Sequence, residues 1–158
     1  MDYQIAKEVE AMQAQFDSVP STSIDVPIGF TPLPHLTELS KKSFWHTNAS
    51  KDFSLTSQDT ICIRFVYPFS KPIYIEFINS HKNRGFSRNR VVKLIVLAYQ
   101  RFYAEEERTS TMLLVPHTLN RGQSNGKYGI WGHFFSHLVL EKLYFDAATN
   151  TVAMFIGS

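Results

Sequence analysis

The sequence predicts an α+β fold in which antiparallel β-hairpins form a sheet packed on one long central helix, with an N-terminal helix and a Pro-rich arm. Three observations support this fold class: two pairs of strand-like segments, one long apolar helical run between them, and no βαβ alternation. The chain has 158 residues, of which 44% are hydrophobic and 13 are Phe, so it is large enough for one domain with an aromatic core.

The first 57 residues are expected to be a helix followed by an arm. Apolar residues recur at helical spacing between residues 2 and 17, which predicts an amphipathic helix; they are Ile5, Val9, Met12 and Phe16. Four of the seven prolines lie between residues 18 and 57 and argue against regular structure there. We expect residues 1–57 to form this helix and Pro-rich arm, packed on their own core or reaching onto another protein, and residues 58–158 to form a single α+β domain.

The centre of the chain is expected to hold a hairpin and then the long helix. Residues 60–67 and 72–79 are rich in β-branched and aromatic side chains, and the four residues between them suit a hairpin turn. Ser87 is a favourable N-cap for a helix from residue 88 to about 108. Its last turn carries Glu105, Glu106 and Glu107. Their negative charges interact unfavourably with the helix macrodipole unless a basic group lies close to them.

Three further elements are expected after this helix. Residues 112–115 form a candidate short strand closed by Pro116, and residues 131–140 a candidate short helix. Residues 141–146 and 151–156 are expected to close the fold as a hairpin that turns at residues 147–150.

Several features bear on where the protein is found. The longest apolar run, from Val91 to Tyr99, is far shorter than the roughly 20 residues of a membrane helix, so no membrane association is expected. The N-terminus lacks the pattern of a signal peptide, and Cys62 is the one cysteine, in a strand-like run where it is expected to be a small buried hydrophobe. These observations predict a cytoplasmic or nuclear protein.

Residues 120–133 form the most unusual segment, because they hold four of the seven glycines. Clustered glycine indicates tight turns or close approach of the backbone to another group. The spacing from Gly122 to Lys127 is one residue too short for a phosphate loop, and Tyr128 stands where such a loop has Ser or Thr. The segment is therefore either a structural loop or a ligand- or peptide-binding loop, with these candidate contact residues: Arg121, Asn125, Lys127, Tyr128, Trp131 and His133.

Two histidines near the end of this loop are candidate metal ligands. His133 and His137 lie four apart, which on a helix places both rings on one face, as in some zinc sites. His117 is the nearest candidate for a third ligand. Two histidines do not make a zinc site, so no cofactor or metal is expected, and packing, capping or exposure to solvent is the preferred interpretation.

The middle of the chain is the basic part. Residues 51–100 carry 8 Lys and Arg against 3 Asp and Glu, although the net charge of the whole chain is only +2. Four of the basic residues lie just before or at the start of the long helix, where an anion or nucleic acid is a candidate ligand; they are Lys82, Arg84, Arg88 and Arg90. A solvated turn or a contact with an acidic protein surface is the alternative interpretation.

Catalytic spacing is absent, whereas the N-terminal helix, the arm and the many aromatic residues offer surface for docking. The first hypothesis is therefore a non-enzymatic interaction or structural module within a larger assembly, with a protein partner. The second is an RNA- or phosphate-binding domain that uses the basic residues 82–90. The third is a metal-dependent enzyme that uses His117, His133 and His137.

Overall fold

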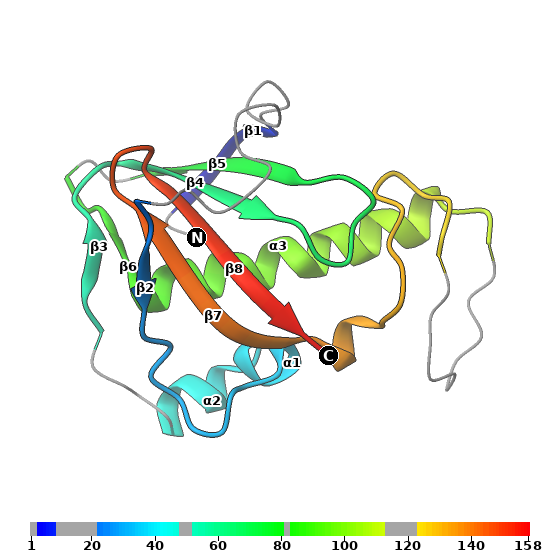
Figure 1. Ribbon diagram of the computed structural model, residues 1–158, viewed down its shortest axis with the longest axis horizontal. Coiled ribbons are helices and arrows are strands. Elements are labelled where there is room, and N and C mark those ends of the chain that lie inside the picture. The colour runs from blue at the N-terminus through cyan, green and yellow to red at the C-terminus, as the bar shows by residue number, and fades with distance from the viewer. Residues whose placement is uncertain (1–2, 9–21, 48–51, 81–82, 113–122) are drawn as a thin grey trace.

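In the computed structural model, the residues described are 3–8, 22–47, 52–80, 83–112 and 123–158. They form a six-stranded sheet with strand order β1-β5-β4-β8-β7-β2, a separate two-stranded sheet and the long helix α3 (Figure 1). The helix lies behind the large sheet in Figure 1, and the two short helices α1 and α2 lie below it. The predicted combination of a sheet with one long helix is confirmed.

The first hairpin forms as predicted. Strands β4 (Thr60–Phe65) and β5 (Ile73–Asn79) pair antiparallel, with Ile61 opposite Phe77 and Ile63 opposite Ile75. All four of these side chains are buried, because alternate positions of both strands face the helix.

Helix α3 (Arg88–Thr109) also forms as predicted, and the Ser87 hydroxyl accepts a hydrogen bond from the amide of Arg90 at its N-terminus. Its sheet-facing side chains are fully buried, among them Val91, Ile95 and Tyr99. The short strands β3 (Ser54–Thr56) and β6 (Phe86–Ser87) pair antiparallel beside its first turn.

The closing hairpin is present as β7 (Val139–Asp146) and β8 (Thr151–Gly157). Strand β8 also pairs in parallel with β4, which joins the two hairpins into one sheet. The helix predicted over residues 131–140 is wrong apart from one 3₁₀ turn, η2 (Phe135–His137). The amide of Leu36 donates to the carbonyl of Leu138, and the amide of Leu140 donates to the carbonyl of Pro34, so backbone groups that a helix would use are engaged by the arm.

The helix predicted at the N-terminus is wrong where the structure describes it. Tyr3–Glu8 is the edge strand β1, which pairs antiparallel with β5. Pairing with β5 gives the backbone groups of this segment hydrogen-bond partners that the amphipathic pattern of the segment alone does not reveal. Residues 2 and 9–17 of the predicted helix, and residues 113–115 of the predicted short strand, lie outside the described residues.

The arm holds more regular structure than its prolines indicated. It includes the edge strand β2 (Ile24–Val26) and the helices α1 (Leu36–Leu39) and α2 (Lys42–Thr47). The described prolines, Pro27, Pro32 and Pro34, lie between β2 and α1 rather than inside either element, which explains the error in the prediction. Leu36 and Leu39 of α1 are at most 2% exposed and belong to the main core. The division of the chain at residue 57 stays a prediction.

No helix among the described residues is both long enough and apolar enough to cross a membrane.

Candidate functional site

The segment 120–133, here called the Gly-rich loop, is described from residue 123 onward. This described part is organised around a buried carboxylate from the last turns of α3. Glu106 is 0% exposed, and its Oε2 accepts hydrogen bonds from the Ser124 hydroxyl at 2.5 Å and from the amides of Gly126 and Ile130 at 3.1 Å each. Its Oε1 accepts from the amide of Tyr128 at 2.7 Å. The loop amides therefore converge on an anion, as in a phosphate loop, but the anion is a side chain of the protein itself.

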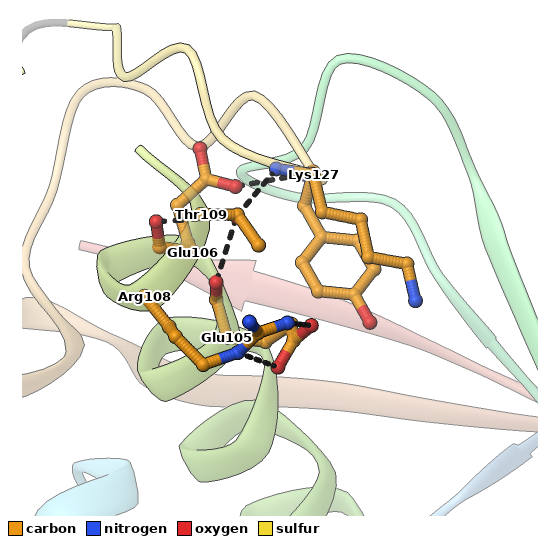
Figure 2. Close-up of polar contacts among 6 residues, drawn as sticks. Glu105, Glu106, Arg108, Thr109 and Lys127 are labelled. Atoms are coloured by element: carbon orange, nitrogen blue, oxygen red, sulfur yellow. Dashed lines mark hydrogen bonds and ion pairs between the residues drawn. The ribbon is translucent and has the colours of Figure 1, made fainter. Parts of the chain in front are cut away.

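Two of the three glutamates in the last turns of α3 have hydrogen-bond donors that stabilise their negative charge. Burial raises the pKa of Glu106, but the hydrogen bonds from Ser124, Tyr128, Ile130 and Gly126 outweigh it and hold the pKa below its ordinary value. Glu105 pairs instead with the Arg108 guanidinium, chiefly by hydrogen bonds that lower the pKa of Glu105 (Figure 2).

The candidate contact residues of the loop fall into separate groups. The side-chain oxygen of Asn125 accepts from the Ser110 hydroxyl and the Thr111 amide, so Asn125 ties the loop to the end of α3. The amide of Lys127 donates to the Thr109 hydroxyl at 2.9 Å, beside the helix end (Figure 2). Arg121 lies outside the described residues.

Lys127 and Tyr128 contribute to a small cavity beside the loop. It encloses about 260 Å³ and is lined by residues of β5, α3 and the loop, namely Ile75, Ala98, Arg101, Phe102, Glu105, Lys127 and Tyr128. The ring of Tyr128 packs edge-on against Phe102 and the Lys127 ammonium lies 5.1 Å from the Tyr128 ring centre, so both side chains have contacts within the protein.

Trp131 and His133 belong to a different surface patch. Trp131 is 42% exposed, and its ring packs edge-on against Tyr67 with 5.1 Å between ring centres. The backbone carbonyl of His133 accepts a hydrogen bond from the Tyr103 hydroxyl at 2.8 Å. The ring nitrogen Nε2 of His133 lies 3.0 Å from the Ser158 hydroxyl.

The structure brings His133 and His137 together, although not on a helix as the spacing suggested. Their ring centres lie 5.7 Å apart, and Nδ1 of His137 accepts from the amide of Phe134 at 3.3 Å. His117 lies outside the described residues. Among the residues that are described, no group of three or more His, Cys, Asp or Glu side chains is placed to hold a metal ion.

The basic residues at the start of α3 do not share one environment. Arg88 is 3% exposed, and its guanidinium donates to the Pro27 carbonyl at 3.0 Å and lies 5.0 Å from the centre of the Phe53 ring. Arg84 is exposed, Arg90 is half-buried with its guanidinium 5.5 Å from the Phe86 ring centre, and Lys82 lies outside the described residues.

A larger groove, which the sequence did not reveal, lies between the short helices of the arm and α3. It encloses about 480 Å³ and is lined by Leu39, Ser40, Lys42, Trp45, His46, Lys93, Val96, Leu97 and Gln100. The α3 members recur at spacings of three, one and three, which makes them one stripe along the helix. This spacing was visible in the sequence, but the short helices that complete the groove were not.

The wall of the groove is held rigidly by aromatic packing. Phe30, Phe44 and Trp45 pack edge-on against one another with ring centres 4.9 to 5.7 Å apart. The indole Nε1 of Trp45 donates to the Leu39 carbonyl at 2.9 Å, which fixes the ring between α1 and α2. The Lys93 ammonium lies 4.8 Å from the Trp45 ring centre and links α3 to this wall.

Comparison of the chain with known protein families, with curated proteins and with solved structures found no match.

Proposed function

We propose that the protein is a non-enzymatic interaction module that binds a segment of a partner protein in the groove between α2 and α3. The observation that supports this function best is the stripe of α3 that lines the groove, formed by Lys93, Val96, Leu97 and Gln100. Leu97 is half-exposed at the centre of this stripe, between the exposed residues Lys93 and Gln100.

The groove has the properties of a preformed binding site. Its floor includes the apolar side chains of Leu39 and Val96, which are each 2% exposed, and its polar residues lie at the rim. Its volume of about 480 Å³ lies in the usual range for ligand sites, roughly 300 to 1,000 Å³. A partner side chain that enters it gains apolar contact with little ordering of the protein, because the Trp45 ring is already fixed.

The two other hypotheses have less support from the geometry. Nucleic-acid binding at residues 82–90 would need Arg88 at the surface, yet its guanidinium is buried against the Pro27 carbonyl. A metal-dependent enzyme would need a third ligand beside His133 and His137, and the described residues offer none.

Peptide selection tests the proposed function and does not require the partner to be identified first. A displayed library of random peptides is selected on the wild-type protein and counter-selected on Leu97→Glu, which places a charge at the centre of the groove. The control is Phe155→Glu, which also replaces an apolar residue with an acid but at a 58%-exposed position on β8 outside the groove.

We expect enriched peptides that bind the wild type and Phe155→Glu equally and lose at least about tenfold in affinity with Leu97→Glu, because an unpaired carboxylate is costly in an apolar site. Circular dichroism of both variants is the check that each is folded. A library that yields no peptide sensitive to Leu97→Glu would contradict the proposed function.

A further inference from the structure

We infer that the segment bound in this groove is an acidic amphipathic helix of a partner protein. The inference rests on the proposed function and adds the chemistry of the partner to it.

The charge of the rim indicates an acidic partner. Lys42 and Lys93 stand at the rim from opposite sides, one on α2 and one on α3, and both are exposed. No carboxylate is among the groove-lining residues that the structure describes, so the two lysines set the sign of the charge at the described rim and favour an acidic segment.

The backbone of the groove indicates a helix rather than an extended peptide. Its described walls come from α1, α2 and α3 and from Ser40 between the short helices, and none of the described lining residues belongs to a strand. In strand addition an extended peptide gains affinity by pairing its backbone with a free sheet edge, and the described lining of the groove offers no such edge. A helix satisfies its own backbone hydrogen bonds and presents only side chains, so it desolvates in this groove at lower cost.

The dimensions of the stripe fit the same conclusion. From Lys93 to Gln100 the stripe covers seven residue steps of α3, which is about 10 Å or two helical turns. Two turns of a partner helix present apolar side chains at i, i+3, i+4 and i+7 over the same length. The partner therefore carries apolar residues at that spacing, with Asp or Glu beside them to meet Lys42 and Lys93.

Three synthetic peptides of about 16 residues, long enough to form a helix on binding, test this inference. All carry Leu at i, i+3, i+4 and i+7, and the flanking positions are Glu in the first, Gln in the second and Lys in the third. The protein is the full chain with Trp131→Phe, which leaves Trp45 as the single tryptophan and makes its fluorescence a direct report on the groove.

We expect the Glu peptide to change Trp45 emission and to bind at least about fivefold more tightly than the Gln peptide, and the Lys peptide to bind most weakly. In the double variant Lys42→Glu, Lys93→Glu the order should reverse, with the Lys peptide now the tightest. Lys71→Glu, at an exposed position in the loop between β4 and β5, is a single charge reversal outside the groove, to be compared with Lys93→Glu alone, and should leave the order unchanged.

Equal binding of the three peptides, or an order that survives the double charge reversal, would overturn the inference while leaving the groove as an interaction site. Absence of Trp45 response to all three peptides would also overturn it, and the library selection then decides the proposed function separately. An anionic polymer of another class, such as single-stranded DNA, that shifts Trp45 emission more strongly than the Glu peptide would contradict a protein partner.

Discussion

The carboxylate of Glu106, at the end of the long helix, accepts a hydrogen bond from the amide of Tyr128 at 2.7 Å, and this bond joins residues 22 positions apart in the chain. With the bonds from Ser124, Gly126 and Ile130, one buried side chain organises the described part of the Gly-rich loop. Removal of this group should therefore affect stability more than removal of any neighbouring acid.

Glu106→Ala is expected to destabilise the protein by about 3 kcal/mol, because it leaves several buried donors of the loop without an acceptor. Chemical denaturation measures the change. Glu107→Ala, at an exposed position of the same helical turn, is the control and should change the free energy of unfolding by less than about 0.5 kcal/mol. Equal effects of the two substitutions would show that Glu106 does not organise the loop.

The stability supplied by Glu106 should depend on pH in one direction. Its pKa is lower in the folded chain than in the unfolded chain, so its contribution is complete above the ordinary glutamate value of about 4.3 and is lost as the pH falls below it. Unfolding measured from pH 7 to pH 3 should show the wild type approaching Glu106→Gln in stability. A difference between the two that grows on acidification would contradict this assignment.

Cys62 should be nearly inert in the folded protein. Burial, with a smaller contribution from the charge of Glu76, raises the pKa of its thiol to about 11. At pH 8 the thiolate fraction is then about two orders of magnitude below that of an ordinary cysteine. Reaction with a disulfide reagent should be slow in the native protein and fast in denaturant, and rapid native reaction would place the thiol at the surface.

Gly129→Ala is expected to cost more stability than Gly132→Ala. Both glycines have positive φ, +59° and +81°, which a side chain adopts only with strain. A Cβ at Gly129 would also lie 2.7 Å from the Ser70 hydroxyl, whereas at Gly132 the nearest group, the Tyr67 hydroxyl, is 3.8 Å away. Thermal denaturation should show losses of roughly 1 to 3 kcal/mol, with the larger loss at Gly129.

Local patterns in the sequence were enough to predict α3 and both hairpins, because their periodicity, caps and turns lie within each segment. The strand β1 and the short helices were missed because they depend on partners elsewhere in the chain. Tyr3–Glu8 is a strand through its pairing with β5, and α1 is anchored by Leu36 and Leu39 in the core.

The same limit applied to the candidate sites. The glycine cluster predicted tight turns or a close approach of the backbone to another group, but no pattern in the sequence indicated that this group is the Glu106 carboxylate. The basic cluster likewise gave no sign that Arg88 is buried, because the Pro27 carbonyl that accepts its hydrogen bond lies 61 residues away in the chain. The helical spacing of four groove residues on α3 is visible in the sequence; they are Lys93, Val96, Leu97 and Gln100. The groove itself also needs α2, which forms its opposite wall.

The parallel pairing of β8 with β4 affects how the protein is assembled during synthesis. Among the described strands β8 is the last to leave the ribosome, yet it lies inside the sheet between β4 and β7. Until it emerges, the β4–β5 hairpin exposes the backbone edge of β4, on which Ile61, Ile63 and Phe65 are apolar. The nascent chain therefore passes through a stage in which the edge of β4 is open to pairing with foreign strands, and this stage ends only when Thr151–Gly157 has emerged and paired with β4.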